Sequence, residues 1–421
     1  MDISLAFLAA CIAAYAVALA RGLAGDRRIQ LYGPLALVRI PAFQSFIRRL
    51  ARFRVPHLTL LAAGTWAAAM VASVGMLVAG AIASLSLTPE QARPEYMIAI
   101  PGLNPLIPIT YGVMALAVAV VLHELAHGVA LVSSGIRIRS AGIAMLGVPL
   151  GAFVEPEGEF DAASDAVKVR VYSSGPFANL AAALLALLLL SQALAGVTPV
   201  AQGVGVLSVR PGSPADKAGI RPGDVITAID GNRTASLSEF LAVIARTRAG
   251  EVVRVELADG RVLLVELADR YAFTGVPRDR GRGFLGVEPV DLNELLPSVV
   301  PFRAGPVESF WRLLGAIFTF HRVAPYLPHF YTEPLGGWGL AYSLLWVAWM
   351  NAVLGLTNVL PAVPLDGGSA LFAALRALAR RVGGPRSEGL VRSLVLALSV
   401  VTLLLLVAPV VIPRVRVLVS P

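Results

Sequence analysis

Stretches of about twenty consecutive apolar residues recur along the chain. A helix of roughly 20 residues spans the hydrocarbon core of a bilayer, so each stretch predicts a membrane-spanning helix. Only 15% of the residues are charged, whereas about 25% are charged in an ordinary soluble domain. The pattern therefore predicts a polytopic α-helical membrane protein with about six spans, near residues 3–20, 58–83, 109–132, 174–196, 338–360 and 391–413.

The arginines give an orientation to these spans. The loop between the first two spans holds one acidic residue, Asp26, and eight arginines: Arg21, Arg27, Arg28, Arg39, Arg48, Arg49, Arg52 and Arg54. Basic loops stay in the cytoplasm, so we expect the N-terminus outside. The net charge of +8 then follows membrane topology and does not indicate nucleic-acid binding. Met1 and Asp2 lack the basic leader of a signal peptide, so we expect the first helix to be retained.

A polar insertion at about 200–270 interrupts the apolar pattern between the fourth and fifth spans. Short alternating strands, a helix near 236–248 and turns rich in glycine, proline and aspartate predict a small soluble α+β module. The orientation of the spans places this module outside the cell. The insertion therefore divides the apolar part of the chain into two halves.

The segment 271–335 is less regular. Its residues Gly283-Phe-Leu-Gly-Val287 predict a strand. Residues 307–330 predict an amphipathic helix at the membrane interface, because Arg312, His321 and Arg322 interrupt the apolar residues. A seventh span is the alternative for this segment.

The segment 135–154 fits neither a helix nor an ordinary loop. Isoleucines alternate with arginines at 136–139, and Pro149 and several glycines then interrupt an apolar stretch. This pattern favours a hairpin that dips back into the membrane, with a plain connector as the alternative. A free sheet edge at this depth could pair with another extended segment and replace the hydrogen bonds that an unwound helix loses.

The predicted span 109–132 is apolar except for His-Glu-Leu-Ala-His at 123–127. On a helix, His123 and His127 share one face, one turn apart. This is the spacing of two zinc ligands, and it places Glu124 as the general base for a zinc-bound water. Each ionisable side chain at bilayer depth costs roughly 2.5–3.5 kcal/mol. A bound zinc ion would explain why three of them occur together.

A catalytic zinc takes three protein ligands and leaves one position open. The only cysteine, Cys11, excludes an internal disulfide and a cysteine-based zinc site. The best third ligand is Asp366, in Asn358-Val-Leu-Pro-Ala-Val-Pro-Leu-Asp-Gly-Gly368. The two prolines, Pro361 and Pro364, should break the fifth helix and leave Asp366 on irregular backbone. A closed structural site would need a fourth ligand, and none is evident.

Three features together resemble the site-2 protease family of intramembrane zinc metalloproteases. They are His-Glu-x-x-His, Asn-x-x-Pro-x-x-Pro-x-Asp-Gly, and an inserted module whose Ser213-Pro-Ala, Ala218-Gly and Gly223-Asp224 resemble a PDZ domain. The resemblance covers about 110–415. It implies a membrane-re-entrant β-hairpin and one zinc ion per chain. It also implies the role of each residue of the two motifs: His123, His127 and Asp366 as ligands, Glu124 as general base, and Asn358 as a donor to the substrate carbonyl or oxyanion.

Two further sites follow from this resemblance. Gly175-Pro-Phe-Ala-Asn179 matches a family motif that makes Asn179 a substrate-positioning residue; a polar link between helices is the alternative. The PDZ-like module either binds the C-terminus of a peptide or acts as a bulk filter above the site. For peptide binding we expect the loop of Gly203, Val204, Gly205 and Val206.

The expected organisation has five parts. They are two additional N-terminal helices with a basic loop (1–108), the first half of the catalytic core (109–199), the PDZ domain (200–270), a strand and an interfacial helix (271–335) and the second half of the core (336–421).

The resemblance implies hydrolysis of a peptide bond within the transmembrane segment of single-pass proteins, that is, regulated intramembrane proteolysis near the cytoplasmic face. The expected partners are these substrates, peptide C-termini and membrane lipids, but not nucleic acid. A transporter or proton pathway would also bury Glu, His and Asp, but gives no reason for the four-residue histidine spacing. An inactive scaffold would lack a catalytic group, and none is missing. The apolar flanks exclude a soluble zinc protease.

Overall fold

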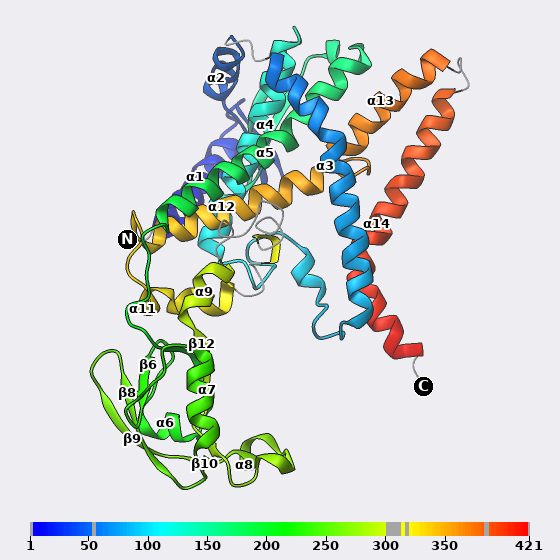
Figure 1. Ribbon diagram of the computed structural model, residues 1–421. Helices are drawn as coiled ribbons and strands as arrows, with labels where there is room; N and C mark the ends of the chain where they lie inside the picture. Colours follow the sequence, from blue (N-terminus) through cyan, green and yellow to red (C-terminus); the bar gives the residue numbers. More distant parts are fainter. Residues whose placement is uncertain (1–2, 53–55, 300–312, 316–319, 383–386, 420–421) are drawn as a thin grey trace. The chain divides into compact units, whose positions relative to one another are not determined.

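The computed structural model describes residues 3–52, 56–299, 313–315, 320–382 and 387–419 (Figure 1). The chain forms two compact units. The first, here the helical unit, consists of Met1–Leu187 and Tyr342–Pro421. The second, here the insertion unit, consists of Leu188–Ala341.

Among the described residues, five helices are long and apolar enough to cross a membrane. They are α3 (Pro56–Ala83), α4 (Ile109–Ser133), α5 (Asp165–Ala193), α12 (Gly337–Asn358) and α14 (Ser387–Val419). The prediction of a multi-pass helical protein is confirmed. The first predicted span corresponds to α1 (Ile3–Leu23). Its apolar part, Leu8–Leu23, is shorter than the other five.

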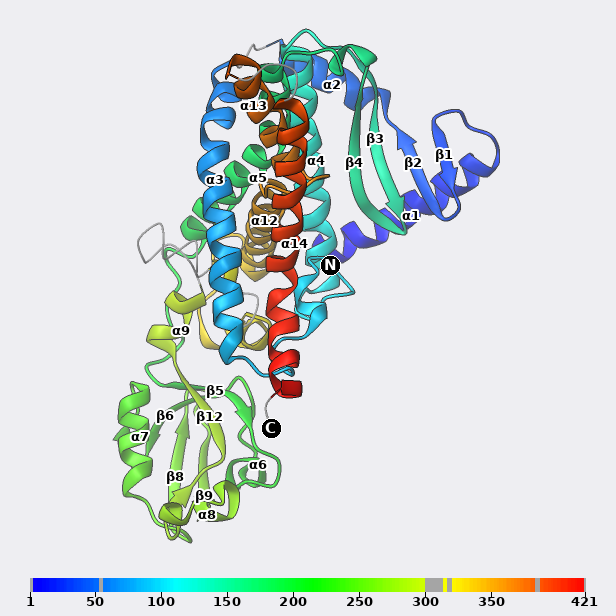
Figure 2. The same cartoon turned by 90° about the vertical axis from the view of Figure 1, so that its right-hand side faces the viewer.

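The helical unit also contains a four-stranded antiparallel sheet in the order β1-β2-β3-β4 (Figure 2). The strands are β1 (Ile29–Tyr32), β2 (Leu35–Arg39), β3 (Ile138–Leu146) and β4 (Val148–Pro156). Strands β3 and β4 form a β-hairpin in the segment predicted at 135–154, joined by Gly147 with a φ of +74°, a conformation that favours glycine. That this hairpin dips back into the membrane stays a prediction. The first two strands lie in the loop that the arginines marked. Sequence analysis did not predict them, because β2 pairs with β3, a strand that is distant from it in the sequence.

The helix α2 (Pro41–Ala51) braces the helix that carries the histidines. Its Ile47 is completely buried against α4. A β-carbon on Gly128 would lie 2.9 Å from Cδ1 of Ile47, so glycine at this position lets α2 approach. Gly128 directly follows His127 in the chain. The N-terminal region therefore packs immediately behind the predicted metal site.

A cluster of charged side chains joins α5, α13 (Asp366–Val382) and α14. The Nε of Arg376 donates to Oδ1 of Asp165 at 2.9 Å, and its Nη1 lies 3.5 Å from Glu388. The hydrogen bond with Asp165 raises the pKa of the Arg376 guanidinium. Because Asp366 is the first residue of α13, this cluster fixes the helix that presents the predicted third ligand.

The insertion unit is built on a six-stranded sheet in the order β12-β5-β6-β8-β9, with β7 beside β6. Its elements are β5 (Val204–Val209), α6 (Pro214–Ala218), β6 (Val225–Ile229), β7 (Asn232–Arg233), α7 (Leu237–Arg246), β8 (Val252–Leu257), β9 (Val262–Glu266) and β12 (Val287–Asp291). Ser236 caps the start of α7, since its Oγ accepts from Glu239 N, and Oε2 of Glu239 accepts from Ala235 N, one residue before the cap. The predicted α+β module is therefore present, and β12 extends it beyond residue 270.

The rest of the insertion unit is made of short elements: β10 (Ala268–Asp269), α8 (Arg270–Thr274), β11 (Gly283–Phe284), α9 (Leu292–Val299) and α11 (Leu327–Phe330). The helix predicted over 307–330 lies partly outside the described residues. Its described end is divided into a 3₁₀ turn (Ala324–Tyr326) and α11. No seventh span therefore occurs among the residues that the structure describes.

Candidate metal centre

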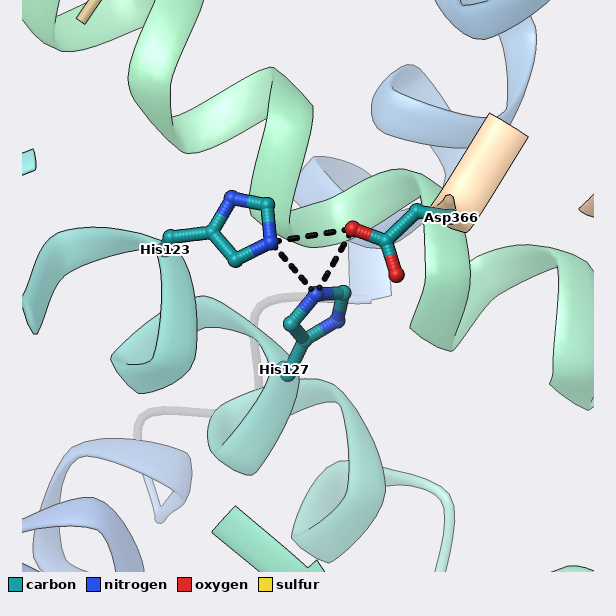
Figure 3. A group of neighbouring side chains, drawn as sticks. All are labelled: His123, His127 and Asp366. Atoms are coloured by element: carbon teal, nitrogen blue, oxygen red, sulfur yellow. Dashed lines mark hydrogen bonds and ion pairs between the residues drawn. The ribbon is translucent and has the colours of Figure 1, made fainter. Parts of the chain in front are cut away.

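Two histidines on α4 and one aspartate on α13 bring three ligand atoms together (Figure 3). Oδ2 of Asp366 lies 2.9 Å from Nε2 of His123 and 3.2 Å from Nε2 of His127. The two Nε2 atoms are 3.0 Å apart. The three residues that the sequence marked as ligands thus converge.

The motif around Asp366 breaks the chain between two helices. The helix α12 ends at Asn358, residues 359–365 are not regular, and α13 begins at Asp366. The break was predicted from the prolines, but Asp366 lies on a helix and not on irregular backbone. A carboxylate is favoured at this end of a helix because the helix dipole is positive there. A β-carbon on Gly367 would lie 2.2 Å from Val359 O, so the turn requires glycine.

Hydrogen bonds to the second ring nitrogen orient each imidazole. Nδ1 of His123 lies 2.6 Å from Oδ1 of Asn179, and Nδ1 of His127 lies 2.8 Å from Val171 O. Val171 O is a carbonyl oxygen and therefore an acceptor. Oδ1 of Asn179 is an acceptor too, and the amide nitrogen of Asn179 donates elsewhere, to Ala119 O. Each Nδ1 therefore carries a proton, and in the neutral imidazole, the form that binds a metal, each Nε2 presents a lone pair toward Asp366.

This donor set fits a zinc ion. Two lone pairs and a carboxylate oxygen within 2.9–3.2 Å of one another repel unless a cation lies among them. Zinc holds nitrogen and oxygen ligands tetrahedrally at about 2.0–2.2 Å, which separates the ligand atoms by roughly 3.3 Å. Among the described residues the candidate ligand group has these three members. Three protein ligands are typical of a catalytic site, which keeps one position open.

The helix α5 forms a close wall beside the imidazoles. A β-carbon on Gly175 would lie 2.4 Å from Nε2 of His127 and 2.7 Å from Nε2 of His123. Only glycine leaves these ligand atoms, and an ion between them, enough room. The structural reason for a glycine in the Gly-Pro-Phe-Ala-Asn motif is therefore the space beside the metal centre.

A cavity of about 340 Å³ opens onto the three ligands. Glu124 lines it, as a general base must. Asn358 lines it too, although its Nδ2 donates to Leu354 O in its own helix. Tyr172 on α5 is a further lining residue, which sequence analysis missed because a tyrosine near the end of an apolar span is common.

Asn179 does not reach this cavity wall. Its side chain is completely buried, and its carboxamide bonds His123, Ala119 O and Asn351. Asn179 thus links α5 to α4 and α12, and it contacts His123 at Nδ1, the ring nitrogen that does not face Asp366. Of the two interpretations made from sequence, this position fits a polar link between helices, with the added task of orienting His123.

The strand β4 borders the cavity through Val154 and is the last strand of its sheet. The direction of its main-chain groups follows from the neighbouring pairs. Ala141 O accepts from Ile40 N on the β2 side, so the next residue, Gly142, faces β4, where it pairs with Phe153. Val154, which follows Phe153, therefore directs its N–H and C=O away from the sheet. Among the described residues this outer edge has no strand partner.

The segment predicted to bind a peptide does not offer such an edge. Gly205 on β5 pairs with Val290 of β12 on one side and with Val225 of β6 on the other. A β-carbon on Gly205 would also meet Leu292 at 2.8 Å. The structure thus places Val204–Val206 inside the sheet of the insertion unit, with Gly203 directly before β5, and β12 is the open strand on that side.

Comparison with known proteins gives a consistent set of relatives. Residues 111–403 match the family described as peptidase family M50. An uncharacterized protein of Methanocaldococcus jannaschii is 27% identical over 284 residues, which cover 67% of this chain and 60% of that protein. The zinc metalloprotease RasP of Shouchella clausii is 29% identical over 196 residues, covering 44% and 46%.

Two other relatives carry similar names. A putative zinc metalloprotease of Rhizobium meliloti is 25% identical over 342 residues, covering 65% of this chain and 88% of the relative. The protease RseP of Yersinia pestis is 29% identical over 203 residues, covering 43% of each protein. The matched part thus spans less than two thirds of three of these four relatives.

Proposed function

The chain belongs to peptidase family M50, the site-2 protease family, and from this premise we propose that it is a zinc metalloprotease that cuts membrane proteins within a transmembrane segment. The observation that carries the proposal is the convergence of His123 and His127, on the membrane-spanning helix α4, with Asp366 of α13. A transporter would not require two lone pairs and a carboxylate oxygen to face one another. A site for one cation does require it.

In the proposed reaction, the metal and the side chains of the protein have different roles. Bound zinc would act as a Lewis acid that activates a water and polarises the scissile carbonyl. Glu124, at the cavity wall, takes the proton of the attacking water and returns it to the leaving nitrogen. A hydrogen bond to the carbonyl oxygen then comes from Asn358, whose amide must turn from Leu354 O, or from the hydroxyl of Tyr172.

The proposed substrate is an unwound transmembrane segment. A helix hides its peptide bonds in its own hydrogen bonds, and water is not present in the bilayer core to replace them. The outward C=O of Val154 lies on the wall of the cavity that Glu124 also lines, and the outward N–H of Val154 faces the Glu124 carboxylate. An extended substrate strand added to β4 would regain its hydrogen bonds there and present one peptide bond to the metal centre. In this role β3 and β4 form the re-entrant hairpin.

We further propose that the module at about 200–270, which the structure extends by β12, is a PDZ domain that either receives a peptide C-terminus or filters substrates by bulk. For peptide binding we propose the edge strand β12 and the neighbouring α7 instead of the segment Gly203–Val206, because Val204 and Gly205 are paired with strands on both sides. The distribution of arginines supports an N-terminus and a PDZ domain outside the cell membrane, with the metal centre near the cytoplasmic face.

A cleavage assay with Glu124→Gln tests the proposed function. Purified protein is incubated in detergent with a peptide corresponding to a single transmembrane span, with and without a zinc chelator. We expect wild-type cleavage that the chelator stops and added zinc restores. Glu124→Gln should keep its zinc but lose cleavage, while Glu159→Gln, which changes a more exposed carboxylate, should cleave normally. Cleavage by Glu124→Gln at the wild-type rate would disprove the role of Glu124.

A further inference from the structure

A second buried carboxamide lies behind the metal centre, on a helix that contributes no ligand. Asn351, on α12, has no exposed surface, and neither has Asn179. Buried polar groups are costly in a membrane-spanning segment unless each donor and acceptor is paired. The two carboxamides satisfy one another, and their partners lead to a ligand of the metal.

The direction of every hydrogen bond in this chain of contacts is fixed. Nδ2 of Asn351 donates to Val347 O at 2.8 Å, one turn earlier in α12. Its Oδ1 is therefore the atom that accepts from Nδ2 of Asn179, at 2.9 Å. The same Nδ2 also donates to Ala119 O at 2.9 Å. This leaves Oδ1 of Asn179 to accept from Nδ1 of His123, at 2.6 Å.

This order matters because a carboxamide turned by half a rotation has nearly the same shape. A turned Asn179 would present its NH₂ group to Nδ1 of His123 and would favour the tautomer with the proton on Nε2. That proton would then point at the position where a metal ion must bind. Two acceptors, Oδ1 of Asn351 and Ala119 O, hold the amide nitrogen on the far side and oppose the turn.

The packing of the two helices supports a dedicated contact. One turn after Asn351, a β-carbon on Gly355 would lie 3.0 Å from Cγ of Leu180 and 3.2 Å from Cβ of Asn179. Glycine at this position lets α12 approach α5 closely. The carboxamides of Asn351 and Asn179 can then meet at hydrogen-bond distance.

We propose that Asn351 is a positioning residue of the metal centre, which acts through Asn179 to keep the Nε2 lone pair of His123 available to the metal. This inference rests on the proposed function, since it assumes that the site holds zinc. Asn351 touches neither the ligand atoms nor the cavity. Its effect is on metal affinity first and on activity as a consequence.

The test measures the zinc dissociation constant by competition with a chromophoric chelator. Loss of a hydrogen-bond partner behind a metal ligand typically weakens metal binding 10–100-fold, so we expect Asn179→Leu and Asn351→Leu to weaken it by about 10-fold or more. Asn351→Asp, which in its neutral form keeps both an acceptor and a donor, should stay within about threefold of wild type. Asn351→Ala provides a second variant without the acceptor if the leucine side chain prevents folding.

A double variant separates a relay from general damage to the fold. Because Asn351 acts through Asn179, Asn179→Leu/Asn351→Leu should bind zinc as weakly as Asn179→Leu alone. Asn104→Leu is the matched control: Asn104 is a buried amide outside the site, so its loss should lower thermal stability and leave the zinc affinity unchanged.

Three results would overturn the inference. These are wild-type zinc affinity in both Asn351→Leu and Asn351→Ala, additive losses in the double variant, or an Asn351→Asp protein as weak as the leucine variant. Failure of the proposed function would look different. In that case the wild-type protein would bind no zinc, or His123→Ala would bind it as well as wild type does.

Discussion

A β-carbon on Gly175 would lie 2.4 Å from Nε2 of His127. Real atoms do not approach so closely, and the glycine belongs to helical backbone that cannot easily move away. We therefore expect Gly175→Ala to displace the imidazoles and to abolish both zinc binding and cleavage. Metal analysis of the purified variant checks the first effect, and the peptide assay checks the second.

Gly80→Ala is the matched control for this variant. Gly80 also lies in a membrane-spanning helix, and a β-carbon there would meet no atom within 4 Å. The control should keep its zinc and its activity. A Gly175→Ala protein with full zinc content would show that the two histidines can bind zinc with a β-carbon beside them, contrary to this prediction.

The outer edge of β4 can be tested with one proline. By the alternation of the strand, Ala152 directs its N–H outward, as Val154 does two residues later. Ala152→Pro removes this N–H without removing a hydrogen bond between β3 and β4. We expect cleavage to fall by about 10-fold or more if a substrate bond worth roughly 1.5 kcal/mol is lost, with zinc content unchanged.

Ala152→Leu keeps the amide and changes only the side chain. It should therefore retain most of the activity that Ala152→Pro loses. Equal activity of the proline variant and wild type would contradict the addition of a substrate strand to this edge.

The brace formed by α2 should contribute measurably to stability. Ile47 is completely buried against Gly128, whereas its neighbour Phe46 is 52% exposed. Removing a buried isoleucine side chain typically costs 2–5 kcal/mol, so we expect Ile47→Ala to lower the free energy of unfolding by roughly 3 kcal/mol. Thermal unfolding in detergent measures this loss. Phe46→Ala should unfold near the wild-type temperature, and an equal loss in both variants would argue against the brace.

Zinc should stabilise the folded protein, because it binds the assembled site and not the unfolded chain. At a free zinc concentration of about 100 times the dissociation constant, this contribution is about 2.7 kcal/mol. A chelator should therefore lower the unfolding temperature of wild type. It should have no effect on His123→Ala, and an equal shift in both proteins would place the stabilising metal elsewhere.

The sequence predicted the metal centre well because helix geometry determines part of it. His123 and His127 share a face on any helix, and the prolines at 361 and 364 required a break in front of Asp366. The rest of the site depends on contacts between helices that are distant in sequence. The close contact of Gly175 with the imidazoles and the hydrogen bond of Asn351 to Asn179 cannot be inferred without the packing of α5 against α4 and α12.

The sheet edges were harder to predict than the helices. The pattern at 135–154 indicated a hairpin, but not that β2 would pair with β3 and leave β4 as the edge beside the cavity. In the insertion unit, the strand predicted near Gly283–Val287 was not assigned to the module at 200–270. The structure pairs β12 with β5, and this pairing is what encloses Gly203–Val206.

X-ray absorption at the zinc K-edge tests the central claim most directly. The wild-type protein should bind one zinc ion per chain with only nitrogen and oxygen neighbours at about 2.0–2.2 Å, and the spectrum of Asp366→Ala should show the loss of a carboxylate ligand or of the metal. A wild-type spectrum without zinc, or one that the Asp366→Ala substitution leaves unchanged, would contradict the claim that His123, His127 and Asp366 bind a single zinc ion.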